Sequence, residues 1–151
     1  VMGILILTAK FGYGHTSAAY SIKEKILLEN SNYNVEIIDF IEYLFPNTSK
    51  IIYGIFNFLV NKCCTLYNFL NKIASKNSKA PLKSFIVRKI DKLLNDNSID
   101  MCISVFPICS QYISAYKTLK KSNTILNTCI TDIDVRKEWI SNETNLYFVE
   151  S

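Results

Sequence analysis

The chain has 151 residues, of which 49% are hydrophobic and 20% charged, and its formal net charge is +4. This length suffices for one domain with a sizeable core but not for two full lobes, and the composition excludes a disordered chain. The cysteines lie at positions 63, 64, 102, 109 and 129 and form no CxxC pair. With a single histidine beside them, they favour reduced core thiols over a zinc site.

The first forty residues predict a β-α-β unit. The apolar run Gly3–Thr8 is typical of a strand buried on both faces of a parallel sheet. A glycine loop follows, and helical spacing begins after Thr16 and Ser17, two residues suited to capping a helix. A second strand is expected over residues 35–40, and the connection between the two strands is expected to be right-handed.

The rest of the chain continues the alternation of helices and strands. Residues 41–79 resemble an insertion, and Trp139 lies near a short irregular segment. Helices are expected over residues 81–94 and 110–121, and strands over 101–106, 124–131 and 146–149. This order predicts a Rossmann-like α/β fold, with a mostly parallel sheet and helices on both faces.

The loop after the first strand is the first candidate ligand site, because ligands of open α/β sheets bind beyond the carboxyl ends of the strands. Glycine permits a tight turn, and a helix N-terminus favours a phosphate or an oxyanion. The loop is not a dinucleotide fingerprint, since the third glycine is missing, and no Gly-Lys-Ser/Thr closes it as a Walker A loop. We take Gly12, Gly14, Thr16 and Ser17 as a candidate loop facing the phosphate of a donor substrate.

His15, the only histidine of the chain, lies in this loop and has two interpretations. The first is a surface or capping histidine. The second is a general base that accepts the proton of an attacking hydroxyl group at neutral pH. A helix N-terminus is expected to lower its pKa and keep the imidazole neutral, as a base must be.

Residues 51–74 predict an amphipathic helix. Polar residues recur in steps of three or four from Asn57 to Lys76 and form one stripe, while the wide apolar remainder includes Phe56, Leu59 and Phe69. Three interpretations remain open: a core helix with a narrow wet face, a transmembrane span that asparagines and a lysine interrupt, and a helix lying in the membrane interface.

The charge distribution favours the membrane interface. Residues 50–92 hold nine basic residues and one acidic residue, a net charge of +8, so the remainder carries −4. Basic residues near an anionic leaflet each contribute on the order of 1 kcal/mol to binding. The candidates for contact with anionic lipids are Lys62, Lys72, Lys76, Lys79 and Lys83. We expect no nucleic-acid partner, because arginine occurs only twice and the lysines alternate with apolar residues.

Two motifs resemble the monogalactosyldiacylglycerol synthase family. The pattern L-I-L-T-A-x-F-G-x-G-H-x-x-A-A over residues 5–19 is similar to the opening of that family. The pattern T-D-x-D-x-x-x-x-W over residues 131–139, followed by the strand at 147–149, is similar to its Thr-Asp segment. Residues 104–107, S-V-F-P, are a softer match. The sequence departs from the family at Tyr13, where many members carry a small residue, and at Thr16, where arginine is common.

The resemblance implies the N-terminal, acceptor-side lobe of a two-lobed GT-B glycosyltransferase whose other lobe binds UDP-glucose or UDP-galactose. His15 corresponds to the leading candidate for the base, and Asp132 to a residue that orients or replaces it. Trp139 and, by the softer match, Pro107 correspond to contacts with the acceptor lipid. The family uses no metal as a rule, and no other cofactor is implied.

The expected function is hexose transfer to diacylglycerol in glycolipid synthesis, by a peripheral enzyme on the cytoplasmic face of the plasma membrane. Residues 1–151 are expected to be a truncated lobe that is inactive alone, since the chain stops just after a strand. Two alternatives stay open. One is transfer to another lipid carrier, such as a peptidoglycan precursor, and the other is a Rossmann-like binding module without catalysis.

Overall fold

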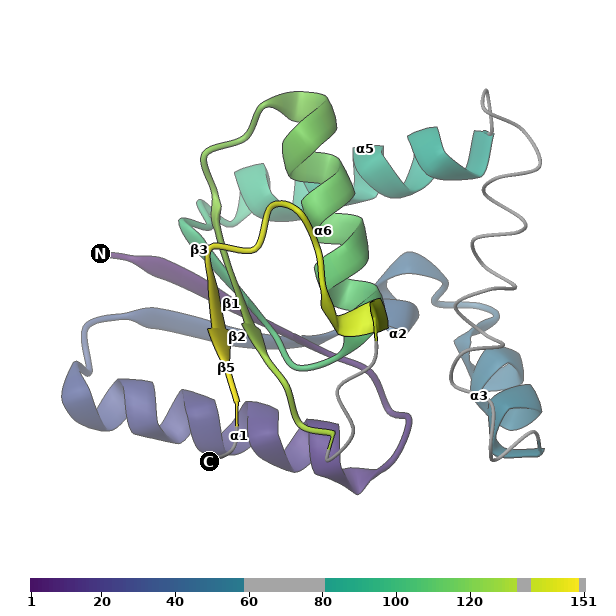
Figure 1. Ribbon diagram of the computed structural model, residues 1–151, viewed down its shortest axis with the longest axis horizontal. Coiled ribbons are helices and arrows are strands. Elements are labelled where there is room, and N and C mark those ends of the chain that lie inside the picture. The colour runs from purple at the N-terminus through teal and green to yellow at the C-terminus, as the bar shows by residue number, and fades with distance from the viewer. Residues whose placement is uncertain (59–80, 133–136, 150–151) are drawn as a thin grey trace.

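The computed structural model describes residues 1–58, 81–132 and 137–149. Five parallel strands form one sheet in the order β2-β1-β3-β4-β5 (Figure 1). Their bounds are β1 Gly3–Thr8, β2 Asn34–Asp39, β3 Met101–Ser104, β4 Ile125–Cys129 and β5 Leu146–Phe148. This arrangement confirms the predicted Rossmann-like parallel sheet.

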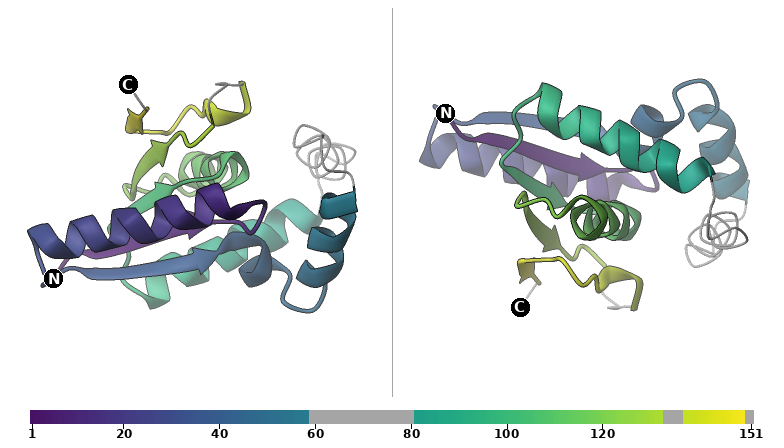
Figure 2. Two further views of the ribbon diagram at one scale, coloured as in Figure 1. Left: turned by 90° about the horizontal axis from the view of Figure 1, so that it is seen from below. Right: turned by 90° about the horizontal axis from the view of Figure 1, so that it is seen from above.

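Helices cover both faces of the sheet, as predicted. Helix α1 (Tyr13–Glu29) lies on one face, and α5 (Pro81–Asp96) and α6 (Pro107–Lys120) lie on the other (Figure 2). Successive side chains of a strand point to opposite faces, so Ile4 and Ile6 pack on the α1 side while Leu5 and Leu7 pack on the α5 and α6 side. Every residue of β1 is buried, which explains its continuous apolar run.

Two helices follow β2 at the carboxyl end of the sheet. Helix α2 (Phe40–Leu44) is capped by Asp39, whose carboxylate accepts the Glu42 N–H at 2.8 Å, and α3 (Ser49–Phe58) lies farther out (Figure 1). After β4, the short 3-10 helix η1 (Lys137–Trp139) carries Trp139, whose indole is buried. Among the described helices, none is both long and apolar enough to span a bilayer.

The structure corrects two helix starts. Helix α1 begins at Tyr13, and its N-cap is Gly12 without any side-chain cap, so the predicted capping role of Thr16 and Ser17 was wrong. Gly12 has φ +104°, which lets the chain turn directly into the helix. Helix α6 begins at Pro107 rather than at residue 110, because proline at the first helical position has its φ fixed for a helix.

Candidate functional site

The candidate site lies where the strand order changes direction. From β1 the chain crosses by α1 to β2 on one side, and later strands add on the other side from β3 onward. In open α/β sheets, ligands usually bind at such a switch point, beyond the carboxyl ends of the two strands that form it, here β1 and β3. His15 in the first turn of α1, Phe106 after β3 and Thr131 after β4 meet at this end.

The imidazole of His15 is held from its Nδ1 side. Nδ1 lies 2.6 Å from the Thr131 hydroxyl oxygen, and that hydroxyl donates to the Val105 carbonyl oxygen at 3.4 Å. We assign the tautomer in which the single hydroxyl proton goes to the carbonyl, so that Thr131 accepts from Nδ1–H. This assignment leaves the lone pair on Nε2, which is the atom available to accept a proton.

Asp132 faces the free nitrogen. Its Oδ1 lies 3.9 Å from Nε2 of His15, too far for a direct hydrogen bond but close enough to stabilise an imidazolium. The indole N–H of Trp139 donates to the other carboxylate oxygen, Oδ2, at 2.9 Å. Since Trp139 is fully buried, it fixes the orientation of the carboxylate. The structure therefore brings together the three residues His15, Asp132 and Trp139 that the sequence singled out.

The pKa of His15 lies below its ordinary value of 6.5. Burial is the largest cause, and the Asp132 carboxylate and the Val105 carbonyl oppose it by raising the pKa. The direction agrees with the sequence-based expectation, and burial is a cause that the sequence did not predict. The side chains of His15 and Asp132 keep 13% and 42% of their exposure, so the pair is not sealed inside the core.

Aromatic rings form the wall behind the imidazole. The ring of Phe106 meets it edge-on at a centroid distance of 5.0 Å, and Trp139 lies at 6.4 Å. Sequence reasoning did not assign roles to Phe106 or to Thr131. Phe106 lies in the S-V-F-P motif and Thr131 begins the Thr-Asp motif, and both follow the end of a strand. Their place after strand ends was the sequence signal for a position at this edge of the sheet.

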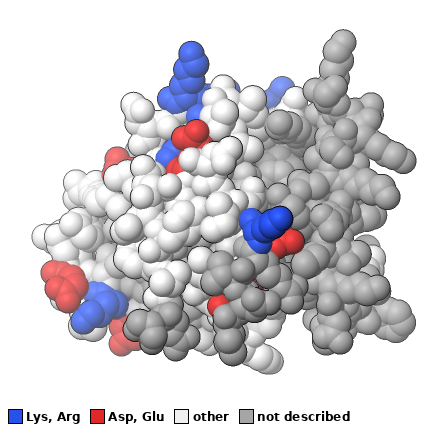
Figure 3. All heavy atoms as spheres, in the orientation of Figure 1, with Lys and Arg blue, Asp and Glu red and all other residues white. Residues whose placement is uncertain are grey.

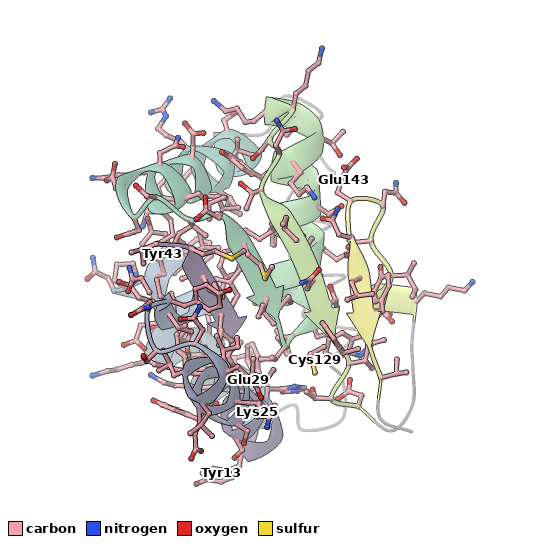
Figure 4. All side chains as sticks on the ribbon, turned by 90° about the vertical axis from the view of Figure 1, so that its left-hand side faces the viewer. Tyr13, Lys25, Glu29, Tyr43, Cys129 and Glu143 are labelled. Atoms are coloured by element: carbon pink, nitrogen blue, oxygen red, sulfur yellow. The ribbon has the colours of Figure 1, made fainter. Side chains whose placement is uncertain are left out.

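The glycine loop is open to solvent in the structure. Gly12 and Gly14 have no neighbour near the position of a Cβ, and Gly14 is already part of α1. Tyr13, the departure from the family pattern, points outward from the start of the helix (Figure 4) and does not narrow the loop. Thr16 and Ser17 follow within α1, one turn into the helix. A role of this loop in binding phosphate remains a prediction.

The structure describes only part of the predicted membrane segment. Leu59, Phe69, Lys62, Lys72, Lys76 and Lys79 lie outside the described residues, as do the side chains of Phe56 and Lys83. On the face shown in Figure 3, the described charged side chains are few and scattered. Pro107, the last predicted acceptor contact, is buried at the start of α6. Among the described residues, no group of three or more His, Cys, Asp or Glu could hold a metal ion.

Comparison with known proteins gives matches over nearly the whole chain. The family model for monogalactosyldiacylglycerol (MGDG) synthase matches residues 15–151. The chain is 29% identical over 157 residues to processive diacylglycerol beta-glucosyltransferases of Bacillus thuringiensis (strain Al Hakam), Bacillus cereus (strain AH187) and Bacillus anthracis (strain CDC 684 / NRRL 3495). Each match covers 97% of this chain and 38% of the relative, so the chain spans well under half the length of these curated relatives.

Proposed function

Because the chain belongs to the monogalactosyldiacylglycerol synthase family, we propose that it forms the acceptor-side lobe of an enzyme that moves a hexose from a UDP-sugar to diacylglycerol. In this proposal the donor is held mainly by a second lobe, which corresponds to the part of the relatives' length that the chain does not span. The observation that carries the proposal is the pair of His15 and Asp132 at the switch point of the sheet.

The reaction requires a base on the acceptor side, since the diacylglycerol hydroxyl is a poor nucleophile while UDP is a good leaving group. The acceptor oxygen forms a bond to the anomeric carbon, and the bond from that carbon to the UDP oxygen breaks with its electron pair leaving on UDP. The acceptor proton passes to Nε2 of His15. The Asp132 carboxylate, 3.9 Å from that atom, stabilises the imidazolium that results.

A neutral imidazole is a precondition of this step. Burial lowers the pKa of His15, so the base is unprotonated at neutral pH before the acceptor arrives. The Nδ1–H bond to Thr131 fixes the tautomer that leaves Nε2 as the acceptor atom. The first turn of α1, with no side-chain cap, is suited to help stabilise the negative charge of the diphosphate.

A transfer assay with the full-length protein tests the proposal. Incubation with radiolabelled UDP-glucose or UDP-galactose and mixed vesicles is expected to label diacylglycerol. A parallel reaction with a peptidoglycan lipid precursor is the matched alternative acceptor. Label in the precursor but not in diacylglycerol would contradict the proposed acceptor, and label in neither lipid with either sugar would contradict transferase activity.

We also propose that α3 contacts the membrane, as part of a peripheral enzyme on the cytoplasmic face of the plasma membrane. Ile51 and Ile55 are one helical turn apart and 61% and 56% exposed, whereas Ile52 and Tyr53 pack against the core. An outward apolar face within the basic segment 50–92 supports a helix lying in the membrane interface. Docking there would place the site close to a lipid acceptor, because α3 lies at the same end of the sheet as the start of α1 (Figure 1), which carries His15.

Replacing Ile51 and Ile55 together by serine is expected to weaken binding to anionic vesicles that contain diacylglycerol. The two side chains together contribute roughly 2 kcal/mol of apolar burial, or about 30-fold in affinity. Sedimentation of the chain with vesicles measures this loss. The matched control replaces Leu28 and Leu119, which are exposed on α1 and α6, by serine. Equal binding by both double variants would contradict docking through α3.

A further inference from the structure

Helix α3 is tied to the turn that precedes His15 by one phenol group. The hydroxyl of Tyr53 donates to the Asp39 carboxylate, with oxygen distances of 2.6 and 2.7 Å, and accepts the backbone N–H of Lys10 at 3.1 Å. Asp39 ends β2 and Lys10 follows β1, so Tyr53 joins the carboxyl ends of two neighbouring strands. None of these three residues carries the proposed chemistry, and none was singled out from the sequence.

Ring contacts continue from Tyr53 to the imidazole. Tyr53 and Phe11 have a centroid distance of 4.8 Å, Phe11 and Phe106 have 5.2 Å, and Phe106 and His15 have 5.0 Å. Phe11 and Phe106 are buried, and close-packed interiors transmit a displacement rather than absorb it. A change in the position of the Tyr53 ring therefore reaches the packing around His15.

The polar contacts of Tyr53 are held in place from both sides. Burial, with the Asp39 hydrogen bond second, raises the pKa of Tyr53, so the phenol keeps its proton and remains a donor. Asp39 is itself fixed by the Glu42 N–H, and the Lys10 ammonium reaches the Glu42 carboxylate at 2.6 Å. The turn before α1 is thus fastened to α2 and α3 as well as to its own strand.

We propose that Tyr53 is a positioning residue for His15, and that its bonds to Lys10 and Asp39 hold the 9–12 turn in the conformation that keeps the imidazole packed against Phe106. The catalytic meaning of this role rests on the proposed function. The structural role does not, since it concerns the conformation of the turn alone. Helix α3 also carries the outward apolar face formed by Ile51 and Ile55. Tyr53 therefore links the helix that bears this face to His15, the proposed base.

The test compares Tyr53→Phe with Tyr116→Phe in a chain labelled with ¹⁵N-histidine. Tyr53→Phe keeps the ring but loses the bonds to Asp39 and Lys10, and Tyr116→Phe removes a similar bond, from α6 to the Asp91 carboxylate at 2.9 Å. The chain has one histidine, so the imidazole signals are unambiguous. Among the described residues, Asp132 is the charged group that faces this imidazole, and neither variant alters it.

Loosening the turn relaxes the burial of His15, and burial is what lowers its pKa. We therefore expect the imidazole pKa to rise toward its ordinary value in Tyr53→Phe and to stay unchanged in Tyr116→Phe. An unchanged pKa in Tyr53→Phe, or an equal rise in both variants, overturns the proposal. If Tyr53→Phe does not fold, hydrogen exchange of the wild-type chain tests the proposal instead. The Lys10 amide is expected to exchange at least about tenfold more slowly than in an unstructured chain. Exchange of this amide at the unprotected rate overturns the proposal.

In the full-length protein, Tyr53→Phe is expected to lower kcat on the order of tenfold with the KM for diacylglycerol unchanged, because misplacement of a base affects the transition state rather than binding. A rise in KM at unchanged kcat overturns the positioning role. If His15→Ala retains full transfer activity, the proposed function fails. The imidazole pKa and the hydrogen exchange of the Lys10 amide still test the role of Tyr53 in the turn.

Discussion

Full-length protein carrying His15→Ala is expected to lose hexose transfer by about 10²- to 10⁴-fold while it binds vesicles as well as the wild type. The imidazole is the group whose Nε2 is free to accept a proton, since Nδ1 is engaged by Thr131. Alanine leaves the acceptor hydroxyl without a base but leaves the outward face of α3 intact. The loss is therefore expected in kcat, measured at saturating UDP-sugar and acceptor vesicles.

The matched control for this variant is Tyr13→Ala, two residues earlier in α1. Tyr13 is 94% exposed and points away from the domain, so its removal is expected to leave both activity and vesicle binding unchanged. Transfer that survives in His15→Ala at the wild-type rate would show that His15 is not the base. Loss of vesicle binding in His15→Ala would instead show that the substitution acts through the fold.

The pH dependence of the wild-type enzyme follows from the same group. A base works only when unprotonated, so kcat/KM is expected to fall as the pH drops through the pKa of His15 in the free enzyme. Since burial lowers that pKa from its ordinary value of 6.5, the midpoint of the acid limb is expected below pH 6.5. The same sign applies to stability: a histidine buried neutral stabilises the fold above its unfolded pKa, and this contribution is lost as the pH falls.

Asp132→Asn is expected to lower kcat on the order of a hundredfold and to move the acid limb to lower pH. The carboxylate stabilises the imidazolium formed in the reaction, so its loss raises the barrier. It also raises the pKa of His15 in the resting enzyme, so its removal lowers that pKa further. The amide is close in shape to the carboxylate and keeps an oxygen that can accept the Trp139 N–H, which preserves the geometry.

The combination of a slower rate and a lower acid limb distinguishes the role of Asp132. If Asp132 were itself the base, Asp132→Asn would abolish the acid limb instead of moving it to lower pH. Glu29→Gln, which removes one negative charge at the far end of α1, is the control for bulk charge and is expected to leave the pH profile unchanged. An acid limb that moves to higher pH in Asp132→Asn would contradict the proposed pairing.

Much of the fold could be predicted from local sequence. The continuous apolar run of β1 predicted a strand buried on both faces, and all six of its residues are buried. The alternation of strands and helices predicted the parallel sheet, because hydrophobic periodicity and short turn signals are local properties. The helix starts were predicted less well. Helix α1 begins at Tyr13, directly after the N-cap Gly12 and before the expected caps Thr16 and Ser17. Helix α6 begins at Pro107, three residues earlier than expected.

The sequence alone determined the five strands, the three helices that cover the sheet, the junction between strand and helix that carries His15, and the Thr-Asp pair that follows a later strand. Only the tertiary structure decided that the Thr131 hydroxyl meets Nδ1 of His15 across 116 residues, that the Trp139 indole holds Asp132, and that Tyr53 reaches the turn before α1. The reason is that these contacts depend on strand order. Because β1 lies between β2 and β3, loops distant in sequence meet at one edge of the sheet, and burial there is the largest cause of the lowered pKa of the histidine.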